Sequence, residues 1–233
     1  ALARYFRGEL RALVHGESAN QGIKARNKEQ RFALELLLND QIRVATLVGR
    51  AGTGKTLLAI AVGLEKVMEQ KNYSRLLITR PVIPLGNDLG FLPGSKEEKL
   101  RPWMQPIYDN LEFIFSGNPE PHRIIEHLMD RGILEMEALA YIRGRSIPKQ
   151  FIICDEAQNL TPHMIKTLIT RVGEGTKIVF TGDPEQIDHP YLDASSNGLT
   201  YLVEHLKDEE IAGHVTLFKG ERSLVAEMGA RLL

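Results

Sequence analysis

The segment that most constrains this chain is 49–56, which reads Gly-Arg-Ala-Gly-Thr-Gly-Lys-Thr. This is the P-loop pattern of a glycine, four residues, a second glycine, a lysine and a serine or threonine. The glycines let the backbone curl so that its N–H groups point at phosphates, and the next helix adds its positive N-terminal end. An apolar run at 44–48 precedes the pattern and a helix-forming run at 57–62 follows it. The segment therefore predicts a strand, a phosphate-binding loop and a helix.

Each residue of the loop is a candidate nucleotide contact. The set is Gly49, Arg50, Ala51, Gly52, Thr53, Gly54, Lys55 and Thr56. In this pattern Lys55 bridges the β- and γ-phosphates of ATP, and the hydroxyl of Thr56 holds Mg²⁺. We therefore expect ATP and Mg²⁺ as ligands.

Composition restricts the class of protein. The chain has 233 residues, is 43% hydrophobic and has a net charge of −1, so it can bury one large core, and any nucleic-acid site must be a local patch. Its one cysteine excludes an internal disulfide and suits a reducing cytoplasm. Because no run of about 18 apolar residues occurs, we expect a cytoplasmic protein without a membrane span.

Apolar runs alternate with helical patterns along the chain. Strands are expected at 44–48, 76–79, 151–154, 178–181 and 215–218, and helices at 28–38, 54–70, 97–115, 160–172, 194–207 and 222–232. This alternation predicts an α/β fold with a parallel sheet covered by helices on both faces. Residues 1–23 are interpreted as an N-terminal arm or linker remnant, residues 24–233 as the ATPase domain, and the Pro- and Gly-rich stretch 81–101 as a long functional loop.

Two acids, Asp155 and Glu156, directly follow the apolar run 151–154. Ligands bind at the carboxyl ends of parallel strands, so these acids can share the nucleotide site. Asp155 would hold Mg²⁺, and Glu156 would orient and deprotonate the attacking water. The alternative is that both acids only cap the next helix.

A second polar segment, Thr-Gly-Asp-Pro-Glu-Gln at 181–186, follows the run 178–181. We predict that Gln186 senses the γ-phosphate and that Asp183 supports the loop. The alternative is a simple Gly-Asp-Pro turn.

The sequences Asp-Glu-Ala-Gln and Gly-Asp-Pro-Glu-Gln match motifs II and III of superfamily 1 helicases. Together with the P-loop and the stretches 22–30, 79–86, 90–100 and 141–146, they make the chain, from about Gly22 onward, similar to the PhoH-like ATPase family. The resemblance implies a single RecA-like core, dependence on ATP and Mg²⁺, a homo-hexameric ring and RNA unwinding. The residues in these stretches are most similar to those of the branch in which this domain follows a PIN ribonuclease domain. No PIN-like acidic cluster occurs in this chain.

The resemblance adds two residues to the predicted site. Gln30 precedes the first strand, where helicases of this type use a glutamine to recognise adenine; its alternative role is in a capping box with Asn27. A single RecA-like lobe lacks the arginine that a second lobe supplies, so a neighbouring subunit would provide it. Arg222 is the candidate, and the alternative is a solvated arginine at a helix start.

Four further residues and one pair of motif residues are candidates for contact with single-stranded RNA. Thr79 and Arg80 resemble helicase motif Ia and would contact phosphates, as would the pair Arg143 and Arg145. Phe91 and Trp103 are candidates for base stacking, although Trp103 also suits packing or a subunit contact.

Two functions remain open at this point. The first is an ATPase that couples hydrolysis to remodelling or unwinding of RNA. The second is an ATP-dependent ring-assembly module that regulates a fused or partner PIN ribonuclease. They differ in whether RNA changes the rate of hydrolysis.

Overall fold

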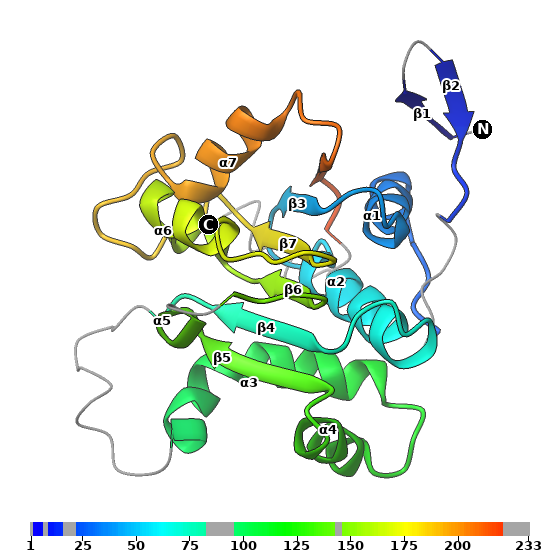
Figure 1. Ribbon diagram of the computed structural model, residues 1–233, viewed down its shortest axis with the longest axis vertical. Coiled ribbons are helices and arrows are strands. Elements are labelled where there is room, and N and C mark those ends of the chain that lie inside the picture. Colours follow the sequence, from blue (N-terminus) through cyan, green and yellow to red (C-terminus); the bar gives the residue numbers. More distant parts are fainter. Residues whose placement is uncertain (1, 7–8, 16–21, 83–95, 143–145, 221–233) are drawn as a thin grey trace.

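The computed structural model describes residues 2–6, 9–15, 22–82, 96–142 and 146–220 (Figure 1). Several predicted features lie outside these residues, namely Phe91, Arg143, Arg145, Arg222, the expected helix 222–232 and most of the loop 81–101.

A six-stranded parallel sheet forms the centre of the protein, in the strand order β5-β4-β6-β7-β3-β8. The strands are β3 (Val44–Gly49), β4 (Leu76–Arg80), β5 (Leu134–Ala138), β6 (Phe151–Cys154), β7 (Lys177–Gly182) and β8 (Ala212–Leu217). All five predicted strands are present. β5 was not predicted, because it is an edge strand whose half-buried Glu135 and Glu137 interrupt any apolar run.

Helices cover both faces of the sheet, and each face has its own hydrophobic core. Alternate residues of β6 point to opposite sides: Phe151 and Ile153 join one cluster, and Ile152 and Cys154 join the other. The first cluster is covered by the four helices α1 (Lys28–Leu38), α2 (Lys55–Leu64), α3 (Lys96–Ile114) and α4 (Pro121–Asp130), and the second by α6 (Pro162–Ile169) and α7 (Gly198–Leu206) (Figure 1). The predicted α/β class, a parallel sheet with helices on both faces, is therefore confirmed.

The helices follow the sequence prediction in most places. They are α1 (Lys28–Leu38), α2 (Lys55–Leu64, extended by a π-helical turn Glu65–Glu69), α3 (Lys96–Ile114), α4 (Pro121–Asp130), α5 (Leu139–Ile142), α6 (Pro162–Ile169) and α7 (Gly198–Leu206). Helices α4 and α5 were not predicted. Helix α7 begins at Gly198 rather than 194, because Asn197 caps it by accepting a hydrogen bond from the N–H of Thr200.

The N-terminal residues include a two-stranded antiparallel hairpin, β1 (Ala3–Phe6) with β2 (Glu9–Ala12), which stands apart from the main sheet in Figure 1. The chain after it is tied to helix α1. The buried carboxylate of Glu35 accepts hydrogen bonds from the N–H groups of Val14 (2.8 Å) and His15 (2.6 Å). The predicted arm is thus partly held against the domain.

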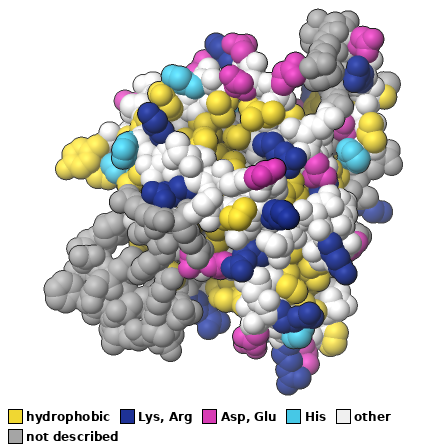
Figure 2. Space-filling model, viewed as in Figure 1, with side chains coloured by type: hydrophobic (Ala, Val, Ile, Leu, Met, Phe, Trp, Pro, Cys, Tyr) yellow, Lys and Arg dark blue, Asp and Glu magenta, His cyan; other side chains and the backbone are white. Residues whose placement is uncertain are grey.

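The surface shows mixed charges on the face drawn in Figure 2. Dark blue Lys and Arg side chains lie among magenta acidic side chains there, instead of gathering into one basic patch. Among the described residues, no helix has the length and apolar character needed to cross a bilayer.

Candidate nucleotide site

Four neighbouring strands end at the same edge of the sheet and bring the predicted residues together. β3 leads into the P-loop, β4 ends at Arg80, β6 is followed by Asp155, and β7 is followed by Asp183. Because all of these strands are parallel, segments more than 100 residues apart in sequence meet at this edge.

The P-loop has the backbone that its glycines allow. Gly52 and Gly54 have φ angles of 81° and 88°, in the left-handed region that favours glycine. Gly49 permits a close approach, since a Cβ there would overlap the backbone oxygen of Leu217 on β8. The ammonium of Lys55 donates to the carbonyls of Gly49 and Arg50, the latter at 2.9 Å. The ammonium of Lys55 therefore lies within the loop, beside the position where the loop would bind phosphates.

Hard oxygen atoms converge on Asp155. Its Oδ1 accepts hydrogen bonds from the hydroxyl of Thr56 (2.7 Å) and from that of Thr181 (2.5 Å). Hydroxyl and carboxylate oxygens are ligands that Mg²⁺ prefers, so this donor set fits the cation. Among the described residues no group of three or more His, Cys, Asp or Glu side chains could hold a metal, so the remaining ligands would be phosphate and water oxygens.

Glu156 has an unusual backbone conformation, and two neighbouring side chains contact its carboxylate. Its φ of 54° lies in the left-handed region, which is costly for a residue with a Cβ and is typical of functional sites. Its Oε1 lies 3.2 Å from Nη2 of Arg80, and its Oε2 accepts a 2.6 Å hydrogen bond from Nε2 of Gln158. Burial, and next the charge of Asp155, raise the pKa of Glu156, as a general base requires.

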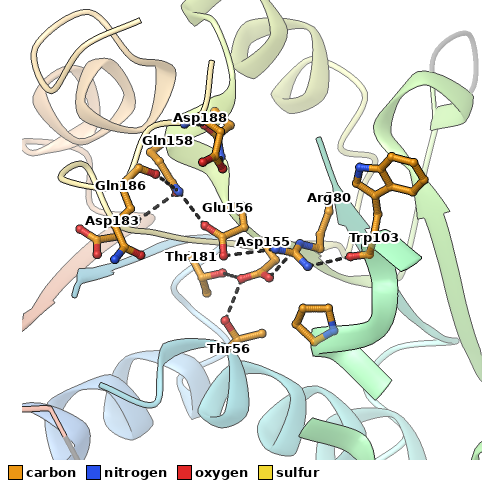
Figure 3. Close-up of polar contacts among 12 residues, drawn as sticks. Thr56, Arg80, Trp103, Asp155, Glu156, Gln158, Thr181, Asp183, Gln186 and Asp188 are labelled. Carbon is orange, nitrogen blue, oxygen red and sulfur yellow. Dashed lines mark hydrogen bonds and ion pairs between the residues drawn. The ribbon is translucent and has the colours of Figure 1, made fainter. Parts of the chain in front are cut away.

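Gln158 links the acid segment to the predicted sensor loop (Figure 3). This fully buried amide donates to Glu156 and to the backbone carbonyl of Gln186 (2.9 Å), and it accepts from the N–H of Asp183 (3.1 Å). Asp183 in turn accepts from the N–H of Ala51 in the P-loop (3.1 Å). Gln158 was not singled out from the sequence, although its place in Asp-Glu-Ala-Gln was available as a signal.

Arg80 and Thr79 lie differently from the motif Ia prediction. The side chain of Thr79 is fully buried and contacts no solvent. The guanidinium of Arg80 turns into the site, where it is 3.3 Å from Oδ2 of Asp155 and donates to the carbonyl of Trp103 (2.7 Å). In this arrangement neither side chain is presented to a nucleic-acid backbone.

Gln30 contacts the P-loop directly. Its Nε2 donates to the carbonyl of Thr53 (3.0 Å), and its Oε1 accepts from the N–H of Arg26 (2.8 Å). Asn27 caps helix α1 by accepting from the N–H of Gln30 (2.9 Å). The structure thus includes the N-cap that was predicted, while the side chain of Gln30 bonds to Arg26 and Thr53.

A cavity of about 260 Å³ lies beside the P-loop, and the side chain of Gln30 is not part of its lining. Its lining includes the predicted Lys55, Thr56, Asp155, Glu156 and Gln186, and also Asn110 of helix α3, which the sequence did not indicate. Such a volume lies near the lower end of small-molecule sites. Arg222 lies outside the described residues.

The sequence was also compared with those of known proteins. Residues 22–226 match the family described as PhoH-like protein. The chain is 57% identical over 224 residues to Protein PhoH2 of Bacillus subtilis (strain 168), covering 96% of this chain and 50% of that protein. It is 38% identical over 234 residues to Protein PhoH2 of Mycolicibacterium smegmatis (strain ATCC 700084 / mc(2)155), covering 100% of this chain and 52% of that protein.

The chain therefore spans about half the length of the curated relatives it matches. Among solved structures, the SWI2/SNF2 ATPase core of Sulfolobus solfataricus in complex with dsDNA aligns with 88% of this chain and 47% of its own, at 15% identity and a TM-score of 0.46. Since the family match extends over most of the sequence, the chain belongs to the PhoH-like protein family.

Proposed function

We propose that this chain binds Mg²⁺ and ATP and couples ATP hydrolysis to the remodelling or unwinding of single-stranded RNA. One observation carries the hydrolytic part: Thr56, Asp155 and Glu156 meet beside the P-loop within one cavity. Support for RNA as the partner comes from the helicase-like motifs of the sequence.

The residues divide the work by their chemistry. The P-loop N–H groups and Lys55 bind the phosphates. Thr56 and Asp155 would hold Mg²⁺, which neutralises phosphate charge when bound. Glu156 accepts a proton from the attacking water, and Gln186 lies on the cavity wall where it can respond to the γ-phosphate.

Steady-state ATP hydrolysis with and without single-stranded RNA, at low salt, tests the proposal. We expect RNA to raise the turnover of the wild-type chain, while Glu156→Gln remains inactive under both conditions. A rate of ATP hydrolysis that RNA does not change would instead support the ring-assembly module acting with a PIN ribonuclease. An absence of hydrolysis beyond that of Glu156→Gln would contradict both.

The pH dependence of turnover follows from the environment of Glu156. A general base must be deprotonated, and burial raises the pKa of this carboxyl above its ordinary value. As the pH falls, we therefore expect turnover to be lost at a higher pH than an exposed glutamate would give. The acidic limb of kcat against pH measures this, and a limb at the ordinary glutamate value would contradict the assignment.

Gln30 is the proposed adenine contact. Its amide oxygen has two lone pairs and its nitrogen two hydrogens, so one further bond can form at each end beside those to Arg26 and Thr53. We expect Gln30→Ala to reduce the preference for ATP over GTP by about tenfold, the loss of one or two hydrogen bonds. Equal losses for both nucleotides would show that Gln30 acts only through the P-loop.

The partners are proposals of the same kind. A homo-hexameric ring would let Arg222 of one subunit reach the nucleotide of the next. Because the chain spans about half the length of its relatives, a PIN ribonuclease domain upstream remains our proposal for the whole protein. Sedimentation with and without ATP measures the first, and the full-length sequence settles the second.

A further inference from the structure

Arg80 connects three parts of the site (Figure 3). At the carboxyl end of β4, its Nη1 donates to the carbonyl of Trp103 in helix α3 at 2.7 Å. Its Nε lies 3.3 Å from Oδ2 of Asp155, and its Nη2 lies 3.2 Å from Oε1 of Glu156. The side chain is only 15% exposed. Since the donors of a guanidinium point in fixed directions, the three acceptors cannot shift independently of one another.

Helix α3 is weakly bonded within itself at this point. It contains Pro102 and Pro106, and proline lacks the N–H that would bond the carbonyl four residues earlier. Pro106 therefore leaves the carbonyl of Pro102, next to Trp103, without its helical donor. Two side chains add hydrogen bonds to the backbone of this part of the helix: Arg80 donates to the carbonyl of Trp103, and Asn110 donates to the carbonyl of Pro106 (2.6 Å). Asn110 also lines the cavity beside the P-loop, so helix α3 forms part of the cavity wall.

The two oxygens of Glu156 are held from opposite sides. Gln158, on the side of the sensor loop, holds Oε2, and Arg80, on the side of α3, holds Oε1. Glu156 is also in the left-handed backbone region, where orientation depends on the surroundings. Loss of either contact would free the carboxylate to turn.

We propose that Arg80 is a positioning residue that couples the position of helix α3 to the orientation of Glu156. This inference rests on the proposed function, in which Glu156 is the base for hydrolysis. A movement of α3 would pull on the guanidinium through the carbonyl of Trp103 and change how Glu156 faces the water. In the reverse direction, a bound nucleotide that rearranges Asp155 and Glu156 would shift helix α3 through the same guanidinium.

The chain provides its own reporter for this coupling. Trp103 is the single tryptophan in the sequence, and its carbonyl is the group that Arg80 holds. Its fluorescence can therefore be measured in the unlabelled protein, while equilibrium dialysis with labelled ATP measures binding separately. The variants are Arg80→Met, which removes the charge, and Arg80→Lys, which keeps it. Arg75→Met is the matched control, because Arg75 directly precedes the same strand and pairs with Glu135 away from the site.

We expect ATP with Mg²⁺ to change Trp103 emission in the wild type and in Arg75→Met. In Arg80→Met, ATP should bind within about threefold of wild type, but the emission should no longer respond. An emission change in Arg80→Met equal to that of the wild type would overturn the coupling, and so would a wild-type emission that ATP leaves unchanged.

Kinetics give a second, independent readout. Arg80→Met should lower kcat by tenfold or more and change KM by less than about threefold. Arg80→Lys should restore kcat only in part, because lysine cannot hold three acceptors in fixed directions.

A merely structural arginine would give another pattern. Nucleotide affinity and the thermal unfolding midpoint would then fall together with kcat, and that result would overturn the inference. If the wild type hydrolyses no ATP, the proposed function fails, while the Trp103 response to bound ATP still tests the contact between α3 and the site.

Discussion

Glu156→Gln is expected to bind ATP and to hydrolyse it about 10²–10⁴ times more slowly than the wild type, the usual contribution of a general base. Glutamine keeps the shape of the side chain but cannot take the proton of the attacking water. The P-loop and the Thr56–Asp155 pair remain intact in this variant, so binding should survive. Single-turnover hydrolysis and retention of labelled ATP on the purified protein measure the two effects.

Asp188→Asn is a suitable control for this variant. Asp188 is an acid near the same segment that contacts Asn159 at 3.3 Å and lies beyond Gln158 in Figure 3, away from Thr56. It should retain wild-type turnover. Full activity of Glu156→Gln would exclude Glu156 as the base and leave hydrolysis to another group.

Arg222→Ala is expected to bind ATP nearly as well as the wild type and to hydrolyse it about 10³–10⁵ times more slowly. This is the contribution that an arginine finger makes to kcat. The charge on the transferring phosphate needs a cation beyond Lys55 and Mg²⁺, and we assign this role to an arginine from the next subunit. Arg123→Ala, which removes an exposed arginine of α4 that pairs with Glu120 just before the helix, serves as the control. Turnover of Arg222→Ala close to that of the wild type would end this assignment.

Mixing two inactive variants separates action between subunits from action within one. Arg222→Ala retains Glu156, and Glu156→Gln retains Arg222. In a mixed ring, some interfaces combine an intact base from one variant with an intact arginine from the other. Recovery of hydrolysis on mixing is expected if Arg222 acts across the interface, whereas no recovery means that both residues serve the same subunit.

Much of the fold and the site could be predicted from residue patterns. Apolar runs mark strands that are buried on both faces, and the P-loop and the acids after 151–154 are local chemistry. Elements at the edge of the fold were missed because they are only partly buried. In β5 the apolar residues alternate with Glu135 and Glu137, and α4 has a single apolar face, with Ile125 and Leu128 as its buried residues. The roles of Arg80 and Gln158 depend on contacts with residues far along the chain, which no local pattern contains.

By itself, the sequence determined that this chain has a phosphate-binding loop, a parallel α/β sheet and two acids beside the loop, because glycine spacing and apolar periodicity act over a few neighbouring residues. Only the tertiary structure decided how those groups are held. Strand order brings Asp155 to Thr56 across 99 residues, and it turns Arg80 inward to Glu156 and helix α3. The direction of a side chain at a strand end is set by which acceptors the neighbouring strands place around it, and these are known only once the sheet is assembled.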